Sequence, residues 1–270
     1  MLAAAAHWLS DQPTTFAVIV SIFVGAGLST LGQLAVHSIL PHAVRSAHND
    51  VSGFTFAAVG VTYAVLLAFV AVAVWQNFTQ TDNQVQTEAN LVGDLYRNSP
   101  AFPEPAASRL RHYLFVYAEI VVDDEWPSLA AGRIDETEGW QLLDKFHTEL
   151  LQMQAKDQTV IAMRVDAVKT LNALYDARRG RFHSASVEMP AILWWNLIAG
   201  AAILMTFTYL FGTPRLWMHV VMVSLLGSLI GLVMALVVLL NNPFRGQNHV
   251  SIAPFQRLVK VVETMAYPHD

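Results

Sequence analysis

The longest uncharged stretch of the chain covers residues 54–75. At 1.5 Å per residue, a helix of this length crosses a hydrocarbon core of about 30 Å. No proline occurs between Pro41 and Pro100, so nothing in the sequence breaks this helix where the apolar stretch ends. Apolar positions then recur at helical spacings of four, three and four residues, at Val85, Ala89, Val92 and Tyr96. We therefore expect one helix that crosses the membrane and continues into a soluble domain.

Three further apolar runs are long enough to span a membrane. The first covers residues 14–40, the second residues 191–211 and the third residues 216–240, and a proline immediately precedes the first two. The turn between the last two runs has only four residues, 212–215, so the two helices should be antiparallel neighbours. The pattern predicts four transmembrane helices.

The segment between the second and third spans is more polar and keeps a helical period throughout. Its apolar stripes cover residues 110–121, 140–153 and 160–174, and no useful length alternates with a period of two. We expect the first of these helices to end at residues 123–127 and the second to be capped by Thr137 or Asp135. A last amphipathic helix should cover about residues 252–265, capped by Ser251.

These elements predict an all-α membrane protein with a helical cytosolic domain inserted between the second and third transmembrane helices. The expected divisions are listed in chain order: a first transmembrane hairpin at 1–76, the cytosolic helical domain at 77–189, a second transmembrane hairpin at 190–241 and a cytosolic C-terminal helix at 242–270.

The second span has two unlike faces when its residues are placed about 100° apart. One face is a stripe of small residues that would let another membrane helix approach closely: Gly53, Ala57, Gly60, Ala64, Ala68 and Ala71. The face roughly opposite consists of Thr55, Val59, Thr62, Leu66 and Phe69. Either both faces are packing surfaces, with each threonine hydroxyl bonded to its own backbone, or one of them lines a pore.

Other spans also carry small or polar residues. Gly227 and Gly231 form a GxxxG pattern in the fourth span, which is typical of close helix contact. Gln33 and His37 lie near the end of the first span and Asn196 lies a turn inside the third. A polar side chain at such a position is costly without a partner. We expect an interfacial position or an interhelical hydrogen bond for Gln33 and His37.

Composition agrees with a membrane protein and excludes some classes. Of the 270 residues, 54% are hydrophobic and 14% are charged, against roughly 25% charged in soluble domains. There is no cysteine, which rules out disulfides and thiolate metal sites. The net charge of -5 argues against nucleic acid as a partner, because nucleic-acid binding requires a basic surface.

The distribution of arginine predicts the orientation. Four spans place the N-terminus, the large domain and the C-terminus on one side, and more arginines lie near the membrane on that side than opposite. The positive-inside rule then places that side in the cytoplasm, so the spans should cross the inner, or plasma, membrane of the cell. For the basic group Arg178, Arg179 and Arg181 we expect contact with anionic lipid headgroups; attraction of permeating anions is the alternative.

Signals for catalysis are absent from the sequence. It contains no HExxH, no GxSxG, no phosphate-binding loop and no pair of intramembrane carboxylates. The contiguous acidic residues Asp123, Asp124 and Glu125 point in different directions on a helix, so they favour a solvated helix end over a cation site. We predict no enzyme activity, no cofactor and no metal site.

Several ordered motifs resemble one family. They are HNDVSGF, VTYAVLLAFV, WQNF, EANLVGDLYR, DDEWPSLAAG, LNALYDARRGR, FTYLFG and NNPFRG, in this order over nearly the whole chain. Together they look like the bacterial bestrophin-like domain family, which is distantly similar to bestrophins, anion channels built as homopentamers.

The resemblance implies four membrane helices, a helical cytosolic region between the second and third, and a pore lined by the second, here within residues 53–78. Bestrophins have an apolar neck on this helix, but their aromatic residues four positions apart have no match that we could assign. The acidic calcium clasp of animal bestrophins has no clear counterpart either.

The leading hypothesis is an oligomeric, pentameric ion channel that favours anions by analogy, with membrane lipid and inorganic ions as its other partners. The lining candidates are Thr55, Val59, Thr62, Leu66 and Phe69. One alternative is a non-conducting membrane adaptor whose acidic helical domain binds a protein or lipid. Another is a transporter that uses Gln33, His37 and Asn196, which requires these polar groups to face one cavity.

Overall fold

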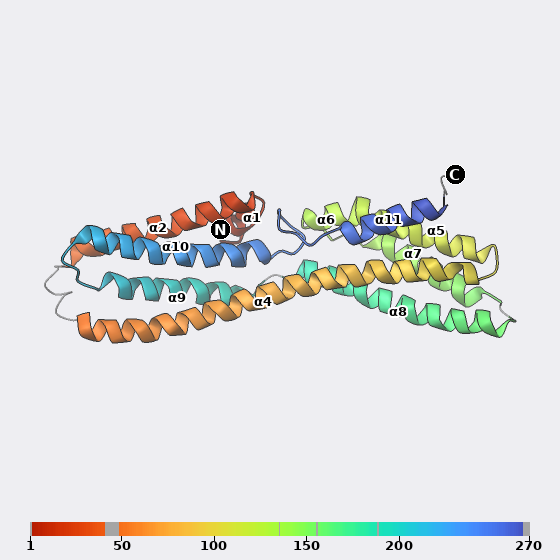
Figure 1. The fold of residues 1–270 in the computed structure, drawn as a ribbon, viewed down its shortest axis with the longest axis horizontal. Coiled ribbons are helices and arrows are strands. Elements are labelled where there is room, and N and C mark those ends of the chain that lie inside the picture. The colour runs from red at the N-terminus through yellow and green to blue at the C-terminus, as the bar shows by residue number, and fades with distance from the viewer. Residues whose placement is uncertain (1, 41–48, 135, 155, 188, 267–270) are drawn as a thin grey trace. The chain divides into compact units, whose positions relative to one another are not determined.

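A computed structural model describes residues 2–40, 49–134, 136–154, 156–187 and 189–266, and within these ranges every regular element is a helix (Figure 1). The all-helical prediction is confirmed. The chain divides into two compact units: residues 1–76, 188–242 and 246–248 form the first, and residues 77–187, 243–245 and 249–270 form the second.

All four candidate membrane spans begin in the first unit. Its helices are α1 (Leu2–Ser10), α2 (Thr14–Ile39), α9 (Ala191–Tyr209), α10 (Leu216–Leu240) and the first part of α4 (Asn49–Asn98). Four of these, α2, α4, α9 and α10, are long and apolar enough to cross a membrane, as predicted. Pro13 and Pro190 directly precede α2 and α9, where the fixed φ of proline suits the start of a helix.

Helix α2 packs along the length of α10, and both also contact α9 (Figure 1). The close approach depends on residues without side chains: a Cβ on Gly25 would overlap the carbonyl oxygen of Gly227, and a Cβ on Gly231 would overlap the carbonyl oxygen of Ser21. The GxxxG glycines of the fourth span therefore lie against the backbone of the first span. Dispersion contacts of this kind hold membrane helices together where lipid gives no hydrophobic driving force.

Helix α4 is continuous over 50 residues, as expected from the absence of proline. Its residues up to Gln76 belong to the first unit and those from Asn77 to the second. In the first unit its buried side packs against α9 and α10 around Leu197, Leu204 and Val237. The α4 residues buried there are Tyr63, Leu67, Val70 and Val74.

The second unit is a bundle of helices around an apolar core. Besides α4 it contains η1 (Ser99–Ala101), α5 (Ala106–Ile120), η2 (Val121–Glu125), α6 (Trp126–Ala130), α7 (Thr137–Gln152), α8 (Gln158–Ser186) and α11 (Ala253–Ala266). Core side chains with no exposed surface come from α4, α5, α7, α8 and α11, among them Val85, Leu110, Leu150, Leu171 and Phe255. Ser251 accepts a hydrogen bond from the backbone N–H of Ala253, as the predicted cap of the last helix should.

One local expectation was wrong and another stays a prediction. The helix expected to end at residues 123–127 instead passes through the π-helical turn η2 into α6, because Pro127 stands in the first turn of α6, where a missing N–H costs no helical hydrogen bond. The helix α7 begins at Thr137, and the preceding residue Glu136 makes no side-chain cap. Asp135, the other expected cap, lies outside the described residues.

Candidate functional site

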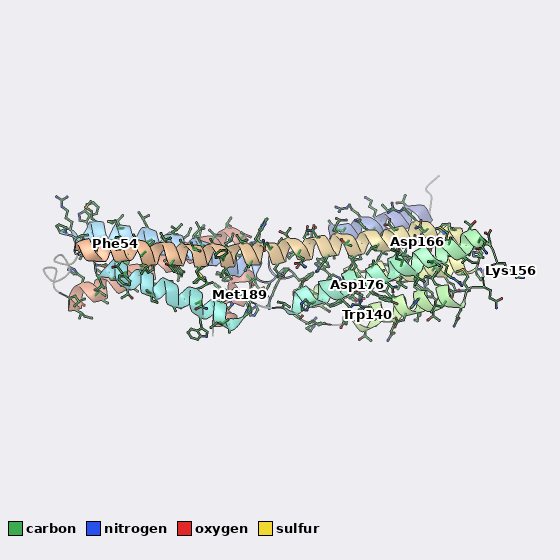
Figure 2. All side chains as sticks on the ribbon, turned by 90° about the horizontal axis from the view of Figure 1, so that it is seen from below. Phe54, Trp140, Lys156, Asp166, Asp176 and Met189 are labelled. Atoms are coloured by element: carbon green, nitrogen blue, oxygen red, sulfur yellow. The ribbon has the colours of Figure 1, made fainter. Side chains whose placement is uncertain are left out.

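The first candidate site is the exposed side of α4 within the first unit, where large apolar side chains recur every four residues. Val61 is 65% exposed, Val65 48% and Phe69 70%. These positions lie opposite the buried residues Tyr63 and Val70 at about 100° per residue. Phe54, labelled near the start of the same helix in Figure 2, is 83% exposed.

The predicted lining residues do not all lie on this exposed side. Thr62 and Phe69 are exposed, but Val59 and Leu66 are half-buried and pack against the core that α4 forms with α9 and α10. Thr55 is also half-buried. The hydroxyl of Thr62 donates a hydrogen bond to its own backbone at Ala58, 2.9 Å away, as the packing alternative expected. The exposed apolar stripe is therefore offset from the predicted one, with Val61 and Val65 in place of Val59 and Leu66.

The small residues of α4 also fall into two groups. Gly60 faces α9, where a Cβ would lie 3.8 Å from Leu204, and Gly53 faces Phe211 at 4.0 Å. Ala57, Ala64 and Ala68 are exposed on one flank of the helix. Within one chain, therefore, only part of the expected packing stripe has a partner helix.

A polar contact joins three spans near the turn between α9 and α10. Gln33 Nε2 lies 3.0 Å from His219 Nδ1, and His219 Nε2 lies 3.1 Å from the carbonyl oxygen of Thr208. Because a carbonyl can only accept, Nε2 of His219 carries the proton and Nδ1 accepts from the Gln33 amide. This is the interhelical hydrogen bond that the sequence suggested for Gln33. Gln33 is fully buried in this contact whereas Asn196 is exposed on α9, so the two do not face one cavity as the transporter alternative requires.

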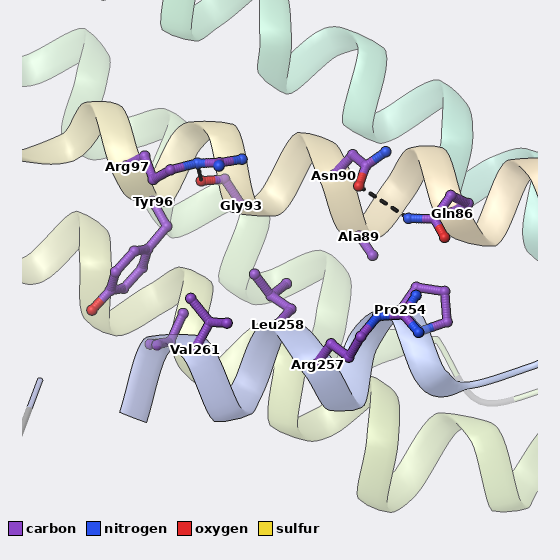
Figure 3. Close-up of a pocket in the computed structure, with 11 residues that line it drawn as sticks. Gln86, Ala89, Asn90, Gly93, Tyr96, Arg97, Pro254, Arg257, Leu258 and Val261 are labelled. Atoms are coloured by element: carbon purple, nitrogen blue, oxygen red, sulfur yellow. Dashed lines mark hydrogen bonds between the residues drawn. The ribbon is translucent and has the colours of Figure 1, made fainter. Parts of the chain in front are cut away.

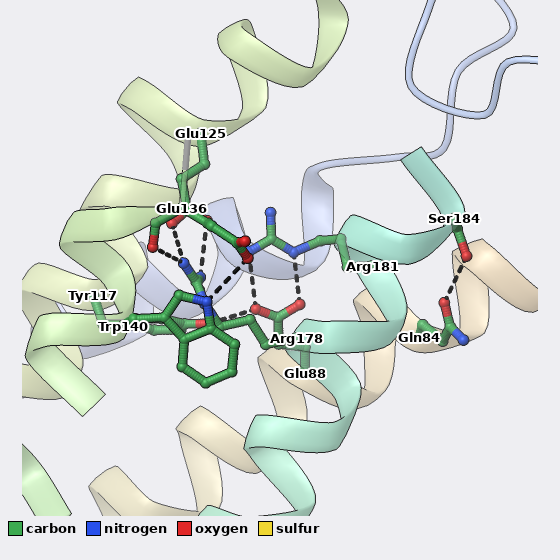
Figure 4. Close-up of polar contacts among 9 residues, drawn as sticks. All are labelled: Gln84, Glu88, Tyr117, Glu125, Glu136, Trp140, Arg178, Arg181 and Ser184. Carbon is green, nitrogen blue, oxygen red and sulfur yellow. Dashed lines mark hydrogen bonds and ion pairs between the residues drawn. The ribbon is translucent and has the colours of Figure 1, made fainter. Parts of the chain in front are cut away.

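The second candidate site is a network of charged side chains buried inside the second unit (Figure 4). Arg181 donates to both oxygens of Glu88, at 2.7 and 3.0 Å, and to Glu125 at 2.6 Å. Arg178 donates to both oxygens of Glu125, at 3.0 and 2.6 Å. Tyr117 donates to Glu88 and accepts from Arg178 at 3.2 Å. The network thus joins α4, α5, η2 and α8.

Electrostatics in this interior favour the charged arginine. Burial by itself would lower the pKa of Arg181, but the adjacent carboxylates of Glu88 and Glu125 raise that pKa above its ordinary value. Burial and the charge of Glu88 raise the pKa of Tyr117, so its hydroxyl keeps its proton and remains a donor. Two glutamates and two arginines balance in charge, which is the condition under which buried ions are tolerated.

Aromatic rings and a glycine leave space for the guanidinium of Arg178. The group lies over the rings of Tyr117, Trp140 and Phe182, with ring centroids 5.3, 5.1 and 4.9 Å away, and it donates to the backbone oxygen of Glu136 at 2.9 Å. A Cβ on Gly139 would overlap the guanidinium and the Glu125 carboxylate.

This network corrects the prediction that Arg178 and Arg181 contact lipid headgroups. Both side chains are 0% exposed, because each faces the interior of the bundle and finds carboxylates there. Arg179, between them, is exposed and pairs with Asp176 on the surface. Of the three arginines, only Arg179 remains available for a headgroup or an anion.

The sequence contained a signal for this network that composition and charge could not reveal. Glu88 begins the motif EANLVGDLYR, Glu125 stands in DDEWPSLAAG, and both buried arginines belong to LNALYDARRGR. Three of the motifs that carry the family resemblance therefore meet in one buried contact.

A cavity of about 380 Å³ lies beside this network, and acidic side chains line it, among them Asp123, Glu125 and Glu138. Among the described residues, no three histidine or acidic side chains gather closely enough to hold a metal ion. Asp123 and Asp124 are exposed while Glu125 is buried, so the three contiguous carboxylates point in different directions. Within the second unit, a cleft between α4 and α11 encloses about 210 Å³, below the roughly 300–1,000 Å³ of typical ligand sites (Figure 3). Gln86 and Asn90 at its edge bond to each other at 3.0 Å.

Comparison with known proteins agrees with this architecture. The model of the Bestrophin-like domain family matches residues 23–255. A crystal structure of a bacterial bestrophin homolog from Klebsiella pneumoniae is 16% identical, with a TM-score of 0.67, over 94% of this chain and 100% of that chain. A point variant of that homolog is 17% identical, with a TM-score of 0.67, over 92% and 98% of the two chains. No curated protein matches the chain. At these identities, the solved structures establish the fold.

Proposed function

The chain belongs to the Bestrophin-like domain family, and from this premise we propose that it is an oligomeric ion channel whose pore is lined by α4. The family resemblance supports a channel-type fold. A homopentamer and a preference for anions are proposed by analogy with bestrophins. A closed ring of identical copies is also the usual way in which one helix per chain encloses a central path.

The observation that carries the proposal is the exposed stripe of Val61, Val65 and Phe69 along a span whose other side is buried. In a ring, the side of α4 farthest from its own core faces the axis. Apolar side chains spaced one helical turn apart would then form successive hydrophobic constrictions, which gate ion flow by excluding water. Thr62 lies on the edge of the same surface.

The proposed orientation follows from the arginine distribution. The second unit and both termini lie in the cytoplasm, and the spans cross the inner membrane. Arg45 and Arg215 are then on the outer side. A reporter protein that functions only in the cytoplasm should therefore be active when it is fused to either terminus.

The proposal is tested by ion flux through purified protein in liposomes. We expect flux in the native protein and a several-fold increase in Phe69→Ala, because a smaller side chain widens and hydrates the constriction. The matched control is Phe23→Ala on α2, since Phe23 is 71% exposed and Phe69 70%. Phe23 lies on a different helix and its removal should leave flux unchanged.

The outcome that contradicts the channel is equally concrete. No flux under varied ions and voltages, together with a monomer or dimer in gentle detergent, would favour the non-conducting adaptor. An equal increase in the two phenylalanine variants would leave conduction standing but remove Phe69 from the pore.

A further inference from the structure

The cleft between α4 and α11 in the second unit combines an apolar floor with a positively charged edge (Figure 3). Apolar side chains from both helices line it: Ala89, Tyr96, Leu258, Val261 and Val262. Of these, Ala89, Tyr96 and Val262 are buried. Among the described residues that line the cleft there are two arginines and no acidic side chain. The charge and the polarity of the walls therefore suit an anion with an apolar body.

Glycine keeps the middle of this cleft open. The two helices run in the same direction along the cleft, and Gly93 of α4 lies opposite Leu258 of α11 (Figure 3). A Cβ at Gly93 would lie 3.4 Å from Cδ1 of Leu258 and 3.6 Å from Nη2 of Arg97. A larger side chain at this position would occupy the space between the two helices.

The two arginines of the cleft differ in what they contact. Arg97 donates to the carboxylate of Asp94 at 2.9 Å and to the carbonyl oxygen of Gly93 at 3.3 Å, so its charge is balanced on its own helix. Arg257 on α11 is exposed, and within the described part of the chain its guanidinium has neither a hydrogen bond nor an ion pair. The guanidinium fork can donate to both oxygens of a carboxylate. Arg257 thus places an available anion-binding group beside the apolar floor.

We propose that this cleft binds a small organic carboxylate, whose apolar body lies against Leu258 and Val261 and whose carboxylate accepts hydrogen bonds from Arg257. The cleft volume of about 210 Å³ equals about seven water molecules at roughly 30 Å³ each, so the ligand has on the order of ten non-hydrogen atoms. A bare inorganic anion would leave the apolar floor uncovered. A neutral apolar molecule would leave the guanidinium without a counter-charge. The cleft lies wholly within the second unit, so this site does not depend on ion conduction.

The test is a titration of the full-length protein in detergent with 4-fluorobenzoate, followed by the fluorine NMR signal of the probe, with empty micelles as the blank. We expect saturable binding to the native protein. Arg257→Gln should weaken binding about tenfold, because the charge-assisted hydrogen bonds are lost. The matched control is Arg179→Gln, the same substitution at an exposed arginine of the same unit outside the cleft, which should leave the affinity unchanged. No saturable binding to the native protein, or equal losses in the two variants, would overturn the site.

Two further measurements separate the charge of the ligand from its apolar body. The neutral analogue 4-fluorobenzamide should bind several-fold more weakly than 4-fluorobenzoate, and acetate should displace the probe only at much higher concentration. Val261→Ser should also weaken binding several-fold; Val261 is 49% exposed, so the substitution leaves the core intact. Equal affinity for the acid and the amide would overturn the role of Arg257, and displacement by acetate at equal concentration would overturn the apolar contact.

Discussion

Replacement of Arg181 by Met is expected to destabilise the second unit by about 3–5 kcal/mol, because Glu88 would lose both of its guanidinium contacts and stay buried as an uncompensated charge. The same change at Arg179 should cost no more than about 1 kcal/mol, since that side chain pairs with Asp176 at the surface. Hydrogen exchange of α8 amides in the full-length protein in detergent measures both effects.

The positions of Arg179 and Arg181 make this comparison well matched. Both lie on α8 two positions apart, so helix propensity and distance from the membrane are nearly the same. The double variant Arg181→Met with Glu88→Met should recover part of the lost stability, because Arg178 and Glu125 still pair and no unpaired carboxylate remains at position 88. Equal losses in the two single variants would contradict a buried network.

Replacement of Gly25 by Ala is expected to lower the thermal stability of the first unit, at a cost of about 1–3 kcal/mol. The new methyl would overlap the carbonyl oxygen and carbon of Gly227, which are backbone atoms and cannot rotate away, so α2 and α10 must separate. Lost contact along this pair is not recovered from lipid. Thermal unfolding in detergent, followed by the circular dichroism of the helices, gives the difference.

Gly27 is the control for this prediction. A Cβ at Gly27 has no atom within 4 Å, although the residue lies on the same helix two positions away. Gly27→Ala should therefore be neutral or slightly stabilising, as alanine favours a helix interior over glycine. A loss of stability in Gly27→Ala as large as in Gly25→Ala would contradict the α2 contact with α10 as the cause, because Gly27 lies outside that contact.

Much of the fold could be predicted because two strong signals agree. Long uncharged runs have few alternatives to membrane helices, and proline positions limit where those helices begin. The continuation of α4 could be anticipated from the lack of proline over residues 42–99. The π-helical turn before α6 could not, because a proline in the first turn of a new helix and a proline that ends an old one look the same in sequence.

The candidate sites were harder to predict. The helical pattern of α4 alone does not say which of its sides faces α9 and α10, and that choice moved Val59 and Leu66 toward the core. For Arg178 and Arg181, the nearest sequence feature was the membrane, but their carboxylate partners come from segments 53 to 93 residues away. Charge pairing over such separations is decided by the tertiary fold.

The buried charge network also limits how this protein can change during evolution. Replacement of one residue among Glu88, Glu125, Arg178 and Arg181 leaves an oppositely charged side chain buried without its partner. Replacement of the whole set by apolar residues of similar volume would lower the stability little. The intermediate sequences between these two solutions are the unstable ones. A protein with these four charges is therefore expected to keep them, because each single substitution away from the set lowers stability. This holds even if a fully apolar interior would be equally stable.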